Sequence, residues 1–447
     1  MVYYFQQRRY FMAVYSELYD YILTMIEKEL GPGSKLPGAR KIGERFSCSL
    51  PKVQAVLDSL EQSRVVESRE RSGTYVREDY YNNILPKNIV CSKFITAISD
   101  DDKRRLRQEF PDMHLSEKFS KGGVEIISSF SILTRQNDYQ DLSSVFSECF
   151  PDSQAEFYME AIKPFIIDGK LCAVPVIFSP QLLWYNPEIF NKAETPLPSN
   201  NWGESEFFTA IRTLHRSIAG RRIINYSPRF HSWIGFVLAS GGILFDKNMP
   251  DPVLADSLQT LGACLKYVNL LRELDLVEDY DDTPARSFAQ GKLAMFCGFR
   301  QSSYVFREHG INFTPQAVYM PNLGSRENHQ GAALIAFRKG LFDKEKIKRM
   351  LNFWLSDSIQ ESLGKSGYGI PFRRSSAQKT LDPTATPDKY FLEKLPPLSS
   401  NYHIYSEELG SVLSRSSHLL NVQRPENVPH FLHELATTMR FLYKINQ

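Results

Sequence analysis

Residues 47–76 read "SCSLPKVQAVLDSLEQSRVVESRERSGTYV". A polar turn comes first, and Ser49 then stands where a helix N-cap is expected. The apolar residues that follow recur at helical spacing, which predicts one buried face made of Val53, Val56, Leu57 and Leu60. After the helix, Gly73 allows the tight turn of a hairpin. Turn, helix and basic hairpin together predict the second half of a winged helix-turn-helix.

The residues upstream complete this motif. Residues 13–30 carry apolar side chains every three or four positions, which predicts an amphipathic helix that stops at Gly31 and Pro32. Residues 40–46 predict a second, short helix. Between Lys35 and Arg77 there are nine Lys or Arg against five acidic residues, a local balance of +4 where DNA contact needs it. We therefore expect a winged helix-turn-helix DNA-binding domain over residues 1–80.

Residues 31–76 resemble the DNA-binding domain of GntR-family transcription regulators. The shared positions are Gly33, Leu36, Pro37, Arg40, Ser49, Val53, Leu60 and the wing residues Gly73, Thr74, Tyr75 and Val76. Two arginines that typically contact DNA in that family are replaced here by Leu50 and Gln54, and a threonine by Lys52. The resemblance therefore implies DNA binding without giving the operator sequence.

The predicted DNA-binding residues come from the charged and polar positions of this motif. Gln54 has the geometry to read adenine, and Lys52 to reach guanine or phosphate. The full predicted set is Lys35, Arg40, Ser49, Lys52, Gln54, Arg69, Arg71 and Gly73. A helix-turn-helix kept only for protein contacts is the alternative reading.

The rest of the 447-residue chain predicts an α/β domain. Residues 81–86 are polar and end in Pro86, as a linker would, and a domain over residues 87–447 follows. Residues 87–98 and 122–133 are strand candidates, with a charged helix over residues 100–110 between them. Strands that alternate with helices imply a sheet with crossover connections.

Four segments in order resemble family 1 extracellular solute-binding proteins. They are "DGKLCAVPVIFSPQLLWYNPEIF" from residue 168, "WIGFVLASGGILFD" from residue 233, "SFAQGKLAMFCGFR" from residue 287 and "GYGIPFR" from residue 367. The resemblance implies a periplasmic-binding-protein-like (type II) fold, with two α/β lobes that close on a ligand, commonly a mono- or oligosaccharide.

Sugars are bound by aromatic platforms and fixed polar groups, and this guides the choice of ligand residues. Phe230 and Trp233 match where the family often places a stacking aromatic. Phe299 and Arg300 follow a strand end, where ligands of α/β sheets tend to bind. Together with two further aromatics, the predicted ligand-binding set is Trp184, Phe230, Trp233, Phe299, Arg300 and Tyr368. For each aromatic, packing in the core is the competing reading.

The net charge is only +2, so any surface that binds nucleic acid must be local.

The sequence lacks the patterns of metal sites, phosphate loops and serine hydrolases. The six cysteines are scattered without metal spacing, and His430 and His433 have no second ligand pair. Gly364, Lys365 and Ser366 lack the earlier glycine of a phosphate loop, and no G-x-S-x-G occurs. We expect no enzyme activity, no cofactor and no metal site.

The sequence also shows neither a secretory signal nor an apolar run long enough to span a membrane. We therefore expect a cytoplasmic transcription regulator that binds an operator in double-stranded DNA as a homodimer and senses a small molecule, a carbohydrate, in its large domain. Two alternatives stay open. In the first, the protein is a cytoplasmic carbohydrate-binding protein without operator recognition. In the second, the cleft is degenerate and the large domain only dimerises.

Overall fold

The computed structural model describes residues 18, 21–22, 25–45, 48–80, 83, 85, 88–110, 113–116, 122–218, 222–227, 230–246, 249–276, 284–325, 328–399 and 424–445. The chain forms two compact units. The first is made of Met1–Ile95, Lys103–Ile126 and Gly340–Phe342, and the second of Thr96–Asp102, Ile127–Lys339 and Asp343–Gln447. Most of the predicted linker, residues 81–86, lies outside the described residues, so the domain limits at residues 80 and 87 stay a prediction.

The first unit opens with the predicted helix-turn-helix and hairpin. Its elements are η1 (Ile26–Leu30), α2 (Ala39–Arg45), α3 (Leu50–Gln62), β1 (Val66–Arg69) and β2 (Gly73–Val76). The buried face of α3 is the predicted one, with Val53, Val56, Leu57 and Leu60. The helix expected over residues 13–30 is described only in part, and its Leu18, Ile22, Met25 and Ile26 are buried in the same core. We call residues 18–80 the head.

Three short parallel strands follow the head, namely β3 (Asn88–Val90), β4 (His114–Ser116) and β5 (Val124–Ser128), with β3 pairing both of the others. The charged helix predicted over residues 100–110 is α5 (Asp100–Glu109). Parallel strands joined through a helix are the expected α/β pattern.

Two predicted strands were too long. Of the strand expected over residues 87–98, only Asn88–Val90 is a strand, and the 3-10 helix η3 (Ser92–Ala97) follows it. Residues 122–133 form β5 and then α6 (Ser129–Thr134). The Ser128 side chain caps this helix by accepting from the Ser131 N–H at 3.4 Å. Continuous apolar runs do not by themselves distinguish a strand from a helix.

The second unit contains two larger sheets, consistent with two lobes. One is an antiparallel sheet in the order β10-β9-β11, made of β9 (Leu182–Tyr185), β10 (Met295–Gly298) and β11 (Gln316–Tyr319). In the other, β8 (Val174–Pro180) lies between β13 (Ile370–Pro371) and β12 (Asn328–Phe337), and β14 (Leu398–Ser399) pairs β12 in parallel. A small hairpin joins β6 (Ile166–Ile167) to β7 (Lys170–Leu171).

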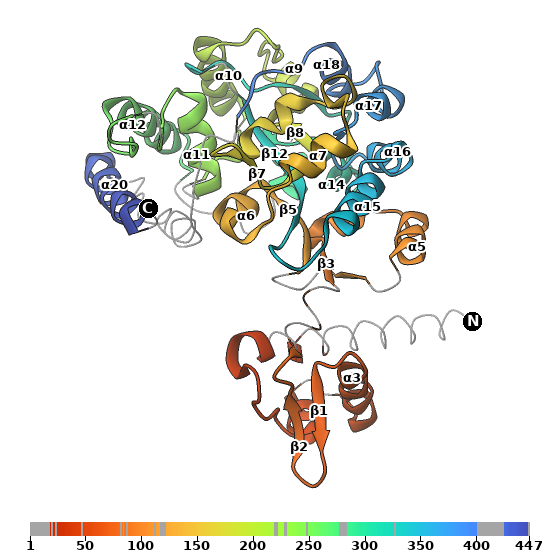
Figure 1. The fold of residues 1–447 in the computed structure, drawn as a ribbon. Coiled ribbons are helices and arrows are strands. Elements are labelled where there is room, and N and C mark those ends of the chain that lie inside the picture. The colour runs from red at the N-terminus through yellow and green to blue at the C-terminus, as the bar shows by residue number, and fades with distance from the viewer. Residues whose placement is uncertain are drawn as a thin grey trace. The chain divides into compact units, whose positions relative to one another are not determined.

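Helices surround these sheets, some directly and others packed on further helices (Figure 1). They are α7 (Ser143–Cys149), α8 (Ser153–Glu156), α9 (Pro187–Lys192), α10 (Glu204–Ser217), α11 (Phe230–Ala239), α12 (Leu258–Glu273), α13 (Pro284–Ala289), α14 (Ser302–Glu308), α15 (Lys344–Trp354), α16 (Asp357–Ser366), α17 (Arg374–Thr380), α18 (Asp388–Glu393) and α20 (Val428–Ile445). Although α20 is far from α12 in sequence, the two lie side by side.

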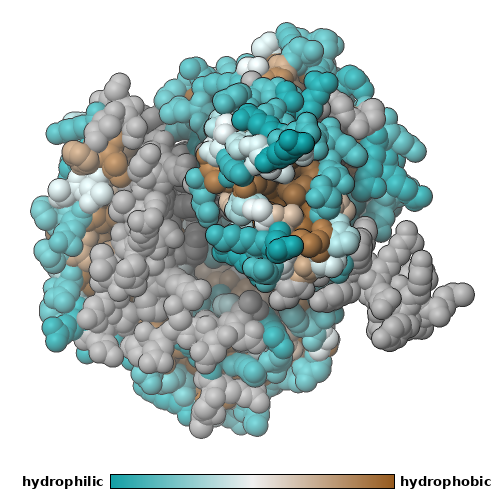
Figure 2. All heavy atoms as spheres, turned by 90° about the horizontal axis from the view of Figure 1, so that it is seen from below, coloured by the Kyte–Doolittle hydropathy of each residue, from teal (hydrophilic) through white to brown (hydrophobic). Residues whose placement is uncertain are grey.

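The chain passes between the two sheets at residues 180–182 and again before β12. The two passages are bound to each other, because the Gln181 N–H donates to the Asn328 side chain at 2.7 Å and the Asn328 amide donates back to the Gln181 carbonyl at 3.1 Å. Among the coloured residues of Figure 2 most are hydrophilic, and the hydrophobic ones gather in a few areas.

Candidate DNA-binding surface and ligand site

The hairpin of the head is extended by a third chain segment. The Gly33 N–H donates to the Val76 carbonyl at 2.9 Å, the Val76 N–H to the Ser34 carbonyl at 2.8 Å, and the Leu36 N–H to the Thr74 carbonyl at 2.9 Å. This pairing places Lys35 opposite Tyr75. The loop before α2 is thereby fixed to the wing.

Three side chains gather around the ring of Tyr75. The Arg69 guanidinium lies 4.3 Å and the Lys35 ammonium 5.8 Å from the ring centroid, both within cation–π range. The Tyr75 hydroxyl lies 2.7 Å from the Ser72 hydroxyl. The wing thus holds two of its predicted DNA-binding cations on one aromatic support, a role for Tyr75 that sequence reasoning missed.

The turn of the wing depends on left-handed backbone. Gly73 has φ of +107° and Arg71 has φ of +59°. Glycine adopts the left-handed backbone at residue 73 without steric cost, as predicted. A side chain at residue 73 would also contact the Lys35 stem, since an added Cβ lies 3.1 Å from Lys35 Cε. Arg71 is exposed at the tip.

The recognition helix α3 begins as predicted at Ser49, although the Ser49 side chain makes no capping hydrogen bond. Lys52 is half-buried, and Gln54 is exposed with its amide donating to Asp58 at 2.8 Å. Arg40 is exposed on α2. The predicted DNA-binding residues therefore lie on α2, on α3 and on the wing with its Lys35 neighbour, and their contacts with DNA stay a prediction.

In the second unit, the two predicted tryptophans lie in the core. Trp184 on β9 is 2% exposed and meets Phe306 edge-on, with ring centroids 5.3 Å apart. Trp233 on α11 is fully buried, and its ring lies 6.0 Å from that of Phe431 on α20. A ligand would reach either ring only after neighbouring side chains moved. The side chain of Phe230, at the start of α11, lies outside the described residues.

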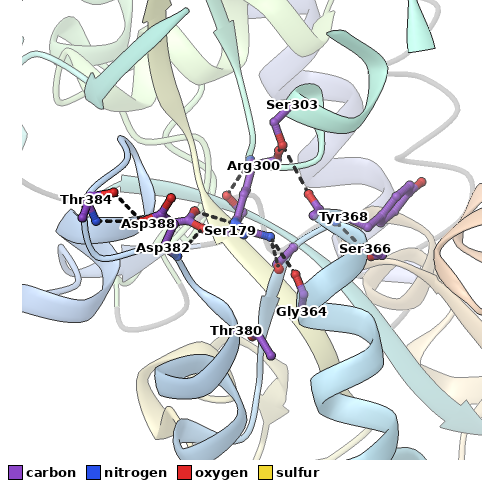
Figure 3. A network of polar contacts seen from close by, with 12 residues as sticks. Ser179, Arg300, Ser303, Gly364, Ser366, Tyr368, Thr380, Asp382, Thr384 and Asp388 are labelled. Atoms are coloured by element: carbon purple, nitrogen blue, oxygen red, sulfur yellow. Dashed lines mark hydrogen bonds and ion pairs between the residues drawn. The ribbon is translucent and has the colours of Figure 1, made fainter. Parts of the chain in front are cut away.

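Arg300 is the centre of a buried polar network (Figure 3). It follows β10, as the sequence predicted, and its Nε and Nη2 donate to the two Asp388 oxygens at 2.7 and 2.6 Å. Its Nη1 donates to the Gly369 carbonyl at 2.9 Å. Its backbone N–H donates to the Ser179 hydroxyl on β8 at 2.9 Å. Most of the guanidinium is thus occupied within the protein, and contact between Arg300 and a ligand stays a prediction.

The other two predicted ligand residues, Phe299 and Tyr368, are partly exposed. Phe299 is half-buried over β12, where an added Cβ on Gly331 would lie 3.2 Å from its ring, and its ring is 5.7 Å from His329. Tyr368 is also half-buried, its ring 6.0 Å from that of Tyr304. Burial raises the pKa of Tyr368, so its hydroxyl stays a hydrogen-bond donor at neutral pH. Whether these residues bind ligand stays a prediction.

Asp388 is the partner that sequence reasoning missed. It lies 88 residues beyond Arg300, in a segment without a recognisable motif, so no local signal identified it. The sequence does contain one sign of the Arg300 network. Gly367 and Gly369 form a glycine-rich loop directly after α16, and the Gly369 carbonyl of this loop accepts a hydrogen bond from Arg300.

Within the described residues, no group of three or more His, Cys, Asp or Glu side chains is placed to hold a metal ion. The six cysteines are free thiols, and burial raises the pKa of Cys172, Cys264 and Cys297 to about 12. These three thiols are therefore unreactive at neutral pH. In the part of the chain that the structure covers, every helix is too short or too polar to span a bilayer.

Comparison with protein families gives two matches. Residues 14–76 match the model of the bacterial regulatory proteins of the gntR family. Residues 132–390 match the model of the bacterial extracellular solute-binding proteins. No curated protein matches the sequence.

Solved structures with similar folds include several solute-binding proteins. UgpB from Mycobacterium tuberculosis, in complex with glycerophosphocholine, has a TM-score of 0.62 at 15% identity over 80% of this chain and 99% of that one. An ABC substrate-binding protein from Listeria monocytogenes, in complex with cycloalternan, has a TM-score of 0.63 at 16% identity over 79% and 98%. A solute-binding protein from Thermotoga lettingae, bound with α-D-tagatose, has a TM-score of 0.64 at 15% identity over 79% and 99%. At this identity the likeness shows the two-lobed fold.

Proposed function

Because the chain belongs to the bacterial extracellular solute-binding proteins and carries a GntR-family DNA-binding head, we propose that it is a transcription regulator whose operator affinity is set by a small ligand. The observation that carries the proposal is the presence of both domains in one chain. Both families bind rather than catalyse, and a DNA-binding head supports a protein that works in the cytoplasm.

The surface of the head supports DNA binding. Lys35, Arg40, Arg69 and Arg71 are exposed cations on the elements that a winged helix presents to a duplex. Each cation that neutralises a phosphate releases counterions, which supplies affinity without sequence preference. Polar side chains on α3 are then left to supply the preference.

The proposed ligand is a mono- or oligosaccharide. Two of the similar structures carry a carbohydrate, cycloalternan or tagatose, while UgpB carries glycerophosphocholine. Of the predicted ligand residues, Phe299 and Tyr368 are only half-buried, so they are the preferred candidates for contact with the apolar face of a sugar. Trp184 and Trp233 are secondary candidates because they are buried.

In the proposed mechanism, ligand closes the two lobes and changes the spacing of two heads in a homodimer. Winged helices commonly meet palindromic half-sites as dimers, and half-site spacing is a geometric constraint. A change of spacing therefore shifts operator affinity.

Fluorescence anisotropy of the full-length protein tests this function. The probe is labelled DNA from upstream of its own gene, with scrambled DNA as control, with and without a pool of oligosaccharides. Preferential binding that the pool strengthens or weakens is expected. Equal binding to both duplexes under all conditions would favour a carbohydrate-binding protein without operator recognition. Preferential binding that no sugar alters would favour a degenerate cleft.

A further inference from the structure

We propose that the recognition helix α3 reads A·T base pairs, with Leu50 contacting a thymine methyl group and Gln54 an adenine. The inference rests on the proposed function and deepens it, because it names the bases that the head recognises. It concerns Leu50 and Gln54, two exposed residues in the first turns of α3.

Leu50 is an apolar side chain at a DNA-facing position. It is the first residue of α3 and is 46% exposed, whereas the apolar residues of the helix that face the core are all buried. The N-terminal residues of a recognition helix are those that contact base edges. An isobutyl group forms no hydrogen bond, and the apolar feature of the major groove is the thymine methyl. Against guanine, Leu50 would leave O6 and N7 without a partner.

Gln54 lies one turn further on the same face. Its amide carries two N–H donors and one carbonyl acceptor. Nε2 donates to Asp58 Oδ1 at 2.8 Å, which orients the amide and leaves its other N–H and its Oε1 available. Adenine presents an acceptor at N7 and a donor at N6, which matches this pair of groups. Asp58 therefore acts as a positioning residue for adenine readout.

The spacing of the two side chains fits neighbouring bases. Four helical residues span about 6 Å along the helix axis, against roughly 3.4 Å between stacked bases. Leu50 and Gln54 thus reach positions one or two base pairs apart. Lys52, the basic residue between them, is half-buried, and residues two apart do not share a helix face. Lys52 therefore does not lie on the face that Leu50 and Gln54 share.

Selection from a random-sequence duplex pool by the full-length protein, at fixed salt, tests the inference. The wild type should enrich a half-site with thymine and adenine within two base pairs. Leu50→Arg should change the thymine position to guanine, and Gln54→Ala should relax the adenine position. A good bidentate contact discriminates by about 1–3 kcal/mol, which is roughly 5- to 150-fold in affinity. Asp58→Asn should weaken the adenine preference less than Gln54→Ala does.

Gln62→Ala, an exposed change at the far end of α3, is the matched control and should leave the selected site unchanged. Circular dichroism of each variant checks that the head is folded. A selected site with guanine at the positions that respond to Leu50 and Gln54 would overturn the inference, as would a site that neither variant alters, and both results would still support a regulator. Wild-type protein that enriches no sequence would contradict both the inference and the proposed function.

Discussion

Arg300 and Asp388 form an ion pair whose contribution to the stability of the protein depends on its burial. Their side chains are 7% and 11% exposed, and the pair joins the end of β10 to α18 and, through the Gly369 carbonyl, to the loop that carries Tyr368. Removing one member leaves the other buried without a counter-charge. We therefore predict that Arg300→Met lowers the free energy of unfolding by about 3–5 kcal/mol. Urea denaturation followed by tryptophan fluorescence measures this, because all four tryptophans lie in the second unit.

Arg212 and Glu273 provide the control. Their side chains are paired at 2.7 Å but are 47% and 39% exposed, so Arg212→Met should cost no more than about 1 kcal/mol. The double variant Arg300→Met with Asp388→Leu should recover much of the loss, because an apolar pair leaves no buried charge. Equal, small losses for Arg300→Met and Arg212→Met would show that the buried pair adds nothing.

The residue scale also shows what the sequence could predict. It placed Arg300 correctly after a strand, because the apolar run before it is a local signal. It could not give Asp388, which is brought there by folding. Likewise the sequence identified Trp233 as an aromatic in a family motif, but its burial against Phe431 depends on α20, almost 200 residues further along. Contacts between distant segments carry no short-range pattern.

At the scale of elements, the wing provides a prediction for DNA binding. Lys35 is exposed and is held beside Tyr75 by the backbone pairing of residues 33–36 with the wing. If it contacts a phosphate, Lys35→Gln should reduce the slope of log affinity against log salt by about 1. The preferred sequence should stay unchanged, because phosphate contacts carry no base information. Anisotropy titrations at several salt concentrations measure both quantities.

Lys192→Gln, an exposed change on α9, is the control for the wing and should leave the slope unaltered. An unchanged slope for Lys35→Gln would remove Lys35 from the DNA contacts. A changed base preference would instead mean that the wing takes part in readout.

The last helix, α20, is bound by a charged cluster. Arg440 contacts Asp256 through two hydrogen bonds of 2.9 Å and Asp251 through one of 2.8 Å. The hydrogen bonds from Arg440 lower the pKa of Asp256 below its usual value near 3.9. A carboxyl whose pKa is lower in the folded state adds stability above its unfolded pKa and loses it as pH falls through the folded pKa.

We therefore predict that Arg440→Met is less stable than wild type by about 1 kcal/mol at pH 6. The difference should shrink as the pH falls below about 4, the unfolded pKa of aspartate. Urea denaturation of both proteins at each pH measures it, and the subtraction cancels the other carboxyls. If the two proteins differ in stability by the same amount at pH 6 and below about pH 4, Asp256 is not the group that causes the pH dependence.

Elements were predictable where their signals are local. The helix α3 and the hairpin β1–β2 follow from helical spacing and a glycine turn, and both are confirmed. The chain segment that pairs with the wing was missed, because its backbone pairing over residues 33–36 needs no side-chain pattern. The strands predicted over residues 87–98 and 122–133 were wrong beyond Val90 and Ser128, since strand length is set by the partner strand and by helix capping.

At the scale of the whole molecule, the proposed function requires linkage between DNA and ligand. If a sugar changes operator affinity by some factor, the operator must change sugar affinity by the same factor. Coupling energies of this kind are typically about 1–3 kcal/mol, or roughly 5- to 150-fold. A sugar that binds only the folded protein also stabilises it, by about 2.7 kcal/mol at a concentration 100 times its dissociation constant.

We predict that a sugar found active in the anisotropy experiment raises the unfolding temperature of the full-length protein and binds with a different affinity when operator DNA is present. Calorimetric titration of sugar into protein, and into protein saturated with operator or with scrambled duplex, measures the two factors. The ratio with operator should equal the ratio found from DNA binding, and the scrambled duplex should leave the sugar affinity unchanged. When two sites lie on one molecule, linkage requires the two affinity ratios to be equal. Unequal ratios would therefore mean that sugar and DNA bind different populations of the protein.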